Sequence, residues 1–199
     1  MLGGSSGINY MAYVRGHPGD FDAWEASGAT GWSYNDVLPY FMKSEDFAPS
    51  TEISIDAEVH GTGGPLGVSV RSPVIPAARD FVTAAQAAGI PKGDYNGRDR
   101  GGPAGVSSLF QTTTRKGMRS STFHAYLEGE TESRPNLTIL THALVTRVTL
   151  SDKDGGKTAT GIEYRDYSGA VHAITAKREV VLCAGAVGSP QILMLSGIG

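Results

Sequence analysis

The chain has 199 residues and a formal net charge of −3, with 17 lysine and arginine residues against 20 aspartate and glutamate residues. This length predicts one domain or two small ones, and the charge argues against the basic surface that nucleic-acid binding requires. A single cysteine, Cys183, excludes an internal disulfide and a cysteine-based zinc site, and the sequence shows neither a membrane-length apolar run nor a signal peptide at its start.

Glycine is in excess, at 27 of 199 residues against a usual share of roughly 7%. In the first segment, Gly3–Gly7 carries almost no side chain and offers backbone N–H groups that suit an anionic or planar ligand. A flexible tail is the alternative interpretation. However, a tail does not ordinarily continue into a stretch such as Ile8–Val14, whose apolar residues favour burial. We therefore predict a backbone that lies close to a cofactor.

Helices are predicted where capping residues precede apolar positions. Ser33 and Asp36 form the Ser-x-x-Asp pattern of a capping box, which opens a helix that carries Val37–Phe41. Trp24 and Trp32 are interpreted as packing residues rather than ligand contacts. Three more helices are expected, at 21–26, at 76–88, and from a cap at Ser120 or Ser121 to Leu127.

Two long polar stretches are predicted to be loops. The first, 48–64, contains His60, which is interpreted as a solvated loop histidine because no carboxylate stands nearby at a useful spacing. The second, 93–105, carries two acidic and two basic residues that either meet a substrate or form a solvated charge cluster, and the second interpretation is favoured. They are Asp94, Arg98, Asp99 and Arg100.

Alternating apolar residues predict strands in the remaining segments. The later ones form a meander whose turns lie at 152–156 and 167–169. The expected strands are 66–70, 106–114, 137–141, 144–150, 158–165 and 171–176.

The closing segment predicts a buried strand, a turn and a helix. Val180–Leu182 is a short apolar run, which is typical of a strand buried on both faces. A small-residue turn follows, in which Cys183 is expected to be a buried packing residue. Ser189 then suits an N-cap and Pro190 the first helical position. Such a unit either places a ligand at the helix N-terminus or is an ordinary strand–helix joint.

Four segments together resemble one family. LGGSSGINYMAYVRG at 2–16 and GAVGSPQILMLSGIG at 185–199 are similar to the two signatures of the glucose–methanol–choline (GMC) flavoprotein oxidoreductases. GMRSSTFHAYL at 117–127 and RPNLTILTHALVTRV at 134–148 resemble the same family in the same order, with a choline-dehydrogenase-like character. Family members also carry an N-terminal GxGxxG unit and a C-terminal region with the active-site histidine. Neither occurs in these 199 residues, so the resemblance implies an internal fragment.

This resemblance implies a mixed α/β fold (α+β) built from parts of two domains. Residues 1–47 and 119–199 correspond to part of a Rossmann-like FAD-binding domain. Residues 48–118 correspond to part of a substrate-binding domain with a mostly antiparallel sheet.

The resemblance also implies which residues meet FAD. Met1, Gly3, Gly4 and the stretch Asn9, Tyr10, Met11 and Ala12 correspond to positions that line the isoalloxazine and pyrophosphate groups. Val145 matches the position whose backbone holds the adenine, although sequence alone favours an ordinary strand valine. Some relatives attach FAD through a histidine in the first segment. Here the equivalent stretch reads Ser-Gly-Ile-Asn, so non-covalent FAD is expected.

The implied reaction is oxidation of a small-molecule alcohol, choline or another primary or secondary alcohol, to a carbonyl compound. In this family a histidine base takes the hydroxyl proton while hydride passes to the flavin, and the electron acceptor is left open. His17, His124, His142 and His172 match no catalytic position, so no catalytic residue and no metal ligand is assigned.

Two alternatives stay open, a non-catalytic binding or interaction module and a family lyase or decarboxylase. No nucleic-acid partner is expected, and no membrane segment is expected in this chain. Cytoplasmic is the expected location, with any targeting segment expected upstream of Met1.

Overall fold

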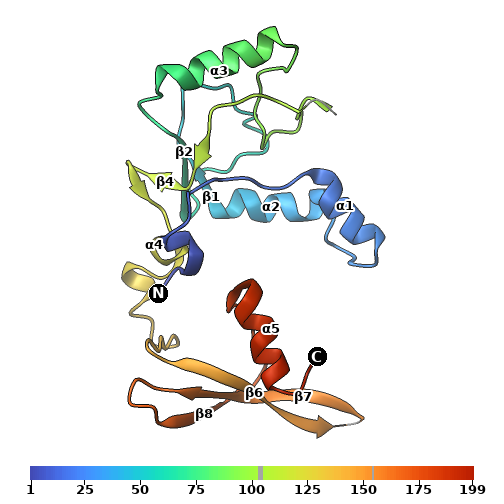
Figure 1. Ribbon diagram of the computed structural model, residues 1–199, viewed down its shortest axis with the longest axis vertical. Coiled ribbons are helices and arrows are strands. Elements are labelled where there is room, and N and C mark those ends of the chain that lie inside the picture. The colour runs from blue at the N-terminus through green and yellow to red at the C-terminus, as the bar shows by residue number, and fades with distance from the viewer. Residues whose placement is uncertain (103–104, 154) are drawn as a thin grey trace. The chain divides into compact units, whose positions relative to one another are not determined.

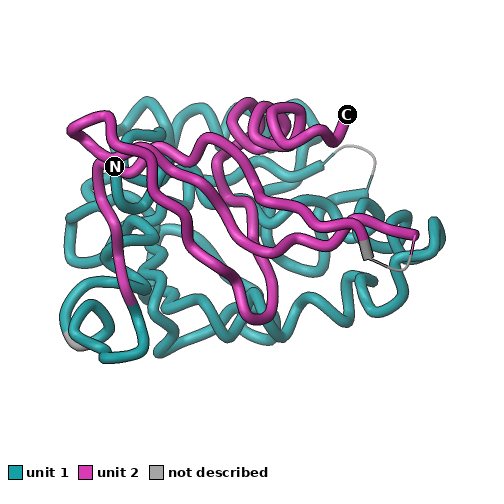
Figure 2. Tube along the Cα trace, turned by 90° about the horizontal axis from the view of Figure 1, so that it is seen from below, with its two compact units in different colours: residues 1–137 teal, residues 138–199 magenta. Residues whose placement is uncertain are grey.

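The computed structural model describes residues 1–102, 105–153 and 155–199, without the side chains of residues 130 and 153. Parts of the expected loop 93–105 and of the expected turn 152–156 therefore lie outside the described residues. The chain forms two compact units, Met1–Leu137 and Thr138–Gly199, which Figure 2 distinguishes by colour. Both helices and strands occur, which confirms the mixed fold class.

Among its described residues, the first unit contains short strands and the helices α1 to α4 (Figure 1). Its main sheet has the order β1–β2–β3, with β1 and β2 parallel and β2 and β3 antiparallel. The elements are η1 Gly4–Gly7, α1 Pro18–Ala26, α2 Tyr34–Ser44, β1 Glu45–Phe47, β2 Leu66–Val70, α3 Pro76–Ala87, β3 Gln111–Thr112, β4 Thr114–Arg115, β5 Met118–Arg119, α4 Thr122–Tyr126 and η3 Gly129–Thr131.

Local capping explains where three of these helices begin. The Ser33 hydroxyl accepts a hydrogen bond from the Asp36 amide at the start of α2, as the capping-box pattern predicts. Ser121 caps α4 in the same way. At α1 the cap is His17, whose ring accepts from the Gly19 amide, so the helix begins at Pro18 rather than Phe21.

The core of this unit lies between the main sheet, α3 and the loop before it. Val68 on β2 is fully buried, and Val82 on α3 is 5% exposed. Burying such side chains removes apolar surface from water, which is the main favourable term in folding. The cluster comprises Tyr13, Phe47, Ile53, Val68, Val70, Val74, Val82 and Leu109.

The expected strand 106–114 is realised only in part. It contains the short strands β3 and β4, whereas the first residues make a single bridge from Ser107 to Lys92. β4 and β5 form a hairpin whose two-residue turn is Lys116-Gly117, both with positive φ. Such a turn matches the twist of a hairpin.

The second unit is an antiparallel meander with one helix, as predicted for this part of the chain. β6 Leu144–Lys153, β7 Gly156–Arg165 and β8 Val171–Thr175 pair in that order. α5 Gly185–Leu195 packs on β6 (Figure 1), and the Ser196 hydroxyl accepts from the Val148 amide at 2.8 Å. The expected strand 137–141 does not form. Its start is a turn in which the Leu137 amide bonds the Arg134 carbonyl, and Leu140 is 50% exposed.

The closing segment differs from its prediction. Val181 is 70% exposed, Cys183 is exposed, and Val180–Leu182 pairs with no strand within the described residues. α5 begins at Gly185, so Pro190 lies inside the helix and Ser189 does not cap it. Instead, the Ser189 hydroxyl accepts from the Ala184 amide at 3.0 Å, across the first turn. An apolar run favours burial, but it forms a strand only where a neighbour supplies the hydrogen bonds.

Candidate functional site

The first unit contains a cleft of about 710 Å³, a size typical of small-molecule sites. Tyr10 and Met11 line it together with Phe110, and the Tyr10 and Phe110 rings are 6.0 Å apart. Tyr10 is 79% exposed, so its ring faces open space. Val70 and Ile75 extend the apolar wall, while Lys116 and Arg71 add cations. The cleft is thus largely apolar, with a few polar groups.

The Asn9–Ala12 stretch is fixed by hydrogen bonds of the Asn9 side chain and by backbone pairing of Met11 and Ala12. The Asn9 side-chain oxygen accepts from the Met11 amide at 2.9 Å and from Arg119 Nη1 at 3.1 Å. The Met11 carbonyl accepts from the Thr113 amide at 2.8 Å, and Ala12 bridges Thr112 in antiparallel fashion. Met11 adopts a φ of 63°, which is uncommon for a residue with a long side chain. The structure therefore fixes this stretch beside the cleft.

The glycine segment before it forms a tight turn. Gly3 and Gly4 have φ values of 85° and 53°, a region that glycine adopts without the usual steric cost. A Cβ at Gly3 would lie 3.2 Å from the Phe123 Cβ, whereas one at Gly4 would meet nothing within 4 Å. Met1 is 84% exposed. The backbone is therefore open at Gly4 and packed at Gly3, and the expected contact of this segment with FAD stays a prediction.

Val145 belongs to the second unit, whereas the other residues predicted to bind FAD belong to the first. It is on β6 opposite Tyr164, and the pairing register shifts between Val145 and Arg147. Such an irregularity leaves backbone groups outside the regular ladder. The assigned role of Val145 depends on its backbone, and that role stays a prediction.

Six buried residues form a closed ring of hydrogen bonds, in which Arg15 takes part through its side chain and through its backbone amide. Glu45 binds Arg15 at 2.5 Å and His60 Nδ1 at 3.0 Å, and His60 Nε2 lies 2.8 Å from Asp94. Gln111 Nε2 donates to Asp94 at 2.8 Å. Asn96 closes the ring by donating to Gln111 at 2.7 Å and accepting from the Arg15 amide at 2.9 Å. We call Arg15, Glu45, His60, Asp94, Gln111 and Asn96 the buried ring.

The interpretation of His60 as a solvated residue is wrong. His60 is 6% exposed, and its ring lies between two carboxylates from positions 15 and 34 residues away along the chain. No local spacing signals partners at such separations. Asp94 is also buried. The other charged residues of its loop also have partners. Arg98 forms ion pairs with Asp56 and Glu58. Arg100 donates hydrogen bonds to the Gly97 and Gly16 carbonyls. Asp99 accepts from the Gly101 amide.

The buried ring shifts the pKa values of His60 and Asp94. Burial by itself would lower the pKa of His60, but the hydrogen bonds with Asp94 and Glu45 outweigh burial and raise this pKa. Burial would raise the pKa of Asp94, but the bonds from His60, the Asn96 amide and Gln111 lower it to about 2. Burial raises the pKa of Tyr13, which contacts Arg15, to about 12.

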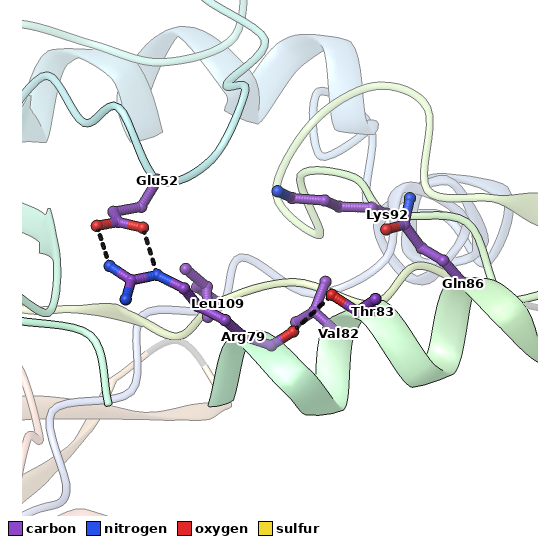
Figure 3. A pocket seen from close by; sticks show the side chains of 7 residues that line it. All are labelled: Glu52, Arg79, Val82, Thr83, Gln86, Lys92 and Leu109. Carbon is purple, nitrogen blue, oxygen red and sulfur yellow. Dashed lines mark hydrogen bonds and ion pairs between the residues drawn. The ribbon is translucent and has the colours of Figure 1, made fainter. Parts of the chain in front are cut away.

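A second, smaller pocket of about 180 Å³ lies over α3. Figure 3 shows the Glu52 carboxylate and the Arg79 guanidinium joined by two hydrogen bonds, while Lys92 extends from the other side. Glu52 already neutralises Arg79, which leaves Lys92 as the main charge toward the pocket. We assign no ligand to this pocket.

Across 1–102, 105–153 and 155–199, no three His, Cys, Asp or Glu residues are grouped so that they could hold a metal ion. No helix in this part of the chain is long and apolar enough to cross a membrane.

Comparison with known proteins agrees with the resemblance. The family model of the GMC oxidoreductases matches residues 1–199. The oxygen-dependent choline dehydrogenase of Yersinia pestis (strain Pestoides F) is 44% identical over 206 residues, which cover all of this chain and 33% of that protein. The corresponding protein of Paraburkholderia phytofirmans is 42% identical, with the same shares. The chain thus spans about a third of the length of these relatives.

Solved structures give the same result. An FAD-dependent oxidoreductase from Chaetomium thermophilum aligns with a TM-score of 0.85 and 35% identity, over 98% of this chain and 34% of that one. Pyridoxine 4-oxidase from Mesorbium loti aligns with a TM-score of 0.82 and 36% identity, over 98% and 36%. The match of the family model to the whole chain and the likeness to these structures lead to one conclusion: the chain belongs to the GMC oxidoreductase family.

Proposed function

We propose that the chain is part of an FAD-dependent enzyme that oxidises the CH–OH group of a small alcohol to a carbonyl. The observation that carries this proposal is the apolar cleft directly beside Tyr10 and Met11, two of the residues expected to line the flavin. A substrate in this cleft lies next to the cofactor. The relatives described as choline dehydrogenase and pyridoxine 4-oxidase support an alcohol as the substrate class.

We propose that the first segment holds the reactive part of FAD. Gly3 lets the chain turn close against Phe123, Gly4 leaves open space beside the backbone, and the doubly fixed Asn9–Ala12 stretch provides a rigid wall. Met1 completes this side, and Val145 serves the adenine through its backbone. When bound, the flavin supplies a two-electron acceptor for the substrate. The protein's part here is to orient the ring and to keep water from it.

Non-covalent attachment is part of the same proposal. The first segment offers no histidine before position 17, and His17 is engaged as the cap of α1. The structures of a formate oxidase variant from Aspergillus oryzae concern modification of FAD, so the point needs a direct test. The catalytic histidine is proposed to lie outside these residues, and the electron acceptor is left open.

The domain assignment is likewise a proposal. Residues 1–47 and 119–199 belong to the FAD-binding domain, and 48–118 belong to the substrate-binding domain, which includes β2, β3 and α3. These boundaries differ from the division after Leu137 that separates the compact units. A cytoplasmic location remains an expectation.

The experiment uses the natural full-length protein that contains this chain. Flavin is released by acid precipitation and identified by chromatography, and non-covalent FAD then stays in the supernatant. Choline, pyridoxine and simple primary alcohols are added without oxygen, and bleaching of the flavin absorbance is recorded. Bleaching with at least one alcohol supports the proposal. A protein that purifies without flavin, or whose flavin no alcohol reduces, contradicts it and favours a binding module or a family lyase.

A further inference from the structure

We propose that His60 is a positioning residue: its doubly protonated ring closes the buried ring and thereby fixes the Tyr10–Tyr13 segment, so that the flavin site loosens at alkaline pH. Only the final step rests on the function proposed above. The effect of His60 on the backbone does not depend on that proposed function.

Between two ionised carboxylates, the His60 ring must carry a proton on each nitrogen to donate to both. Nδ1 lies 3.0 and 3.1 Å from the two Glu45 oxygens, and Nε2 lies 2.8 Å from Asp94 Oδ2. Ionised carboxylates only accept hydrogen bonds, and a histidine donates from both nitrogens only as an imidazolium. The charges then balance, because Arg15 and His60 offset Glu45 and Asp94. Asp94 is ionised at neutral pH, since its pKa is lowered to about 2.

Loss of one proton disturbs this balance. A neutral ring turns a lone pair toward one carboxylate and leaves an excess negative charge in a buried site, which is unfavourable. The charged groups that face His60 are Glu45 on β1 and Asp94 in the loop after α3, with Arg15 on the far side of Glu45. The Phe47 ring, whose centroid lies 4.4 Å from that of His60, is uncharged. Tyr13 stays neutral, since its pKa is raised to about 12.

The disturbance reaches the flavin-facing backbone through two amide side chains. Asp94 accepts a hydrogen bond from the Gln111 side chain, and the Gln111 side chain accepts one from Asn96. Asn96 in turn donates to the Tyr13 carbonyl at 3.0 Å and accepts from the Arg15 amide. The Gln111 carbonyl also accepts from the Tyr13 amide at 3.0 Å. The buried ring therefore forms hydrogen bonds with the backbone of Tyr13 and Arg15. These residues follow directly on the segment whose Tyr10 and Met11 line the cleft.

The test is hydrogen exchange of the Tyr13 and Arg15 amides in the natural full-length protein. Opening the buried ring exposes His60 to water, where its pKa returns to about 6.5. Between that value and the raised pKa of the closed ring, opening releases one proton. Protection of these amides, corrected for intrinsic base-catalysed exchange, should then fall about tenfold per pH unit. A wild-type protein whose protection shows no such slope overturns the proposal.

Two variants assign the slope to His60. Glutamine forms hydrogen bonds but does not titrate, so His60→Gln should abolish the slope. Asp94→Asn, the second variant, removes one of the two carboxylates and should end the slope at a lower pH. The matched control is His172→Gln, because His172 lies 2.7 Å from Asp166 in an exposed pair outside the buried ring. A slope that persists in His60→Gln, or disappears in the control, contradicts the assignment.

The flavin supplies an independent readout. In protein that carries flavin, its visible absorption band should shift over the same pH range, and this shift should be lost in His60→Gln. A band that does not move while the amides lose protection overturns the link to the flavin site. A protein that holds no flavin but shows the exchange slope contradicts the proposed function instead and leaves the role of His60 supported.

Discussion

Arg15 and Glu45 form an ion pair with both side chains fully buried, and Arg15 Nη2 lies 2.5 Å from Glu45 Oε2. Glu45 also accepts from the Gly61 amide and binds His60. A buried charge is tolerated only when its partners remain, because water cannot replace them. One carboxylate thus joins three separate parts of the chain.

Glu45→Gln should destabilise the first unit strongly, since it leaves Arg15 without its counter-charge. Removing one partner of a buried pair typically costs about 3–5 kcal/mol. Denaturant unfolding of the full-length protein measures this loss. Glu52→Gln is the control, because the Glu52–Arg79 pair in Figure 3 is solvent-accessible and exposed pairs add little. Equal losses of unfolding free energy in both variants would contradict the argument that burial makes the Arg15–Glu45 pair costly to break.

Acid should weaken the protein through Asp94. Its pKa is lowered from 3.8 to about 2, so the native state favours the ionised form. The resulting stability is present above the ordinary pKa of 3.8 and is lost as pH falls toward 2. The contribution is about 2 kcal/mol. Denaturant midpoints recorded across this range should fall in the wild type and should fall less steeply in Asp94→Asn.

Gly3→Ala and Gly4→Ala should separate folding from cofactor binding. Both glycines have positive φ, which costs an alanine roughly 1 kcal/mol. At Gly3 the new methyl also crowds Phe123, whereas at Gly4 it enters open space. We expect Gly3→Ala to lower the melting temperature more, and Gly4→Ala to lower flavin content more. The reverse order would contradict the placement of FAD against Gly4.

Val68→Ala should destabilise the first unit by about 2 kcal/mol, because it leaves a cavity under a fully buried side chain. The comparison is Val187→Ala on α5, where the side chain is 82% exposed and little burial is lost. Thermal melts of both variants check the difference. A melting temperature for Val68→Ala close to that of the wild type would show that the core collapses around the missing methyl groups.

Elements with local signals were predictable from the sequence. The serine caps of α2 and α4 act between residues three apart, and the β6–β8 meander has short turns. In both cases a few neighbouring residues determine the structure. The stretch around Asn9–Ala12 was predicted through its resemblance to a family, and the cleft beside it became visible only in three dimensions.

Features that depend on distant partners were missed. His60 looked like a loop histidine because its carboxylates stand 15 and 34 residues away. The error at Val180–Leu182 has the same origin. Its apolar character indicates a preference for burial, but a strand also needs neighbours, and no described residue pairs with this one. Composition does not say where such partners come from.

The buried ring also has a consequence for the order of folding. Its bonds join residues far apart in sequence: Arg15 and Asn96 are 81 positions apart, and Arg15 and Glu45 are 30 positions apart. Closing such long loops is entropically costly, so we expect these contacts to form late in folding. Substitutions in the buried ring should then accelerate unfolding while leaving the refolding rate almost unchanged. The buried ring would thus determine the unfolding rate, and with it the lifetime of the native state.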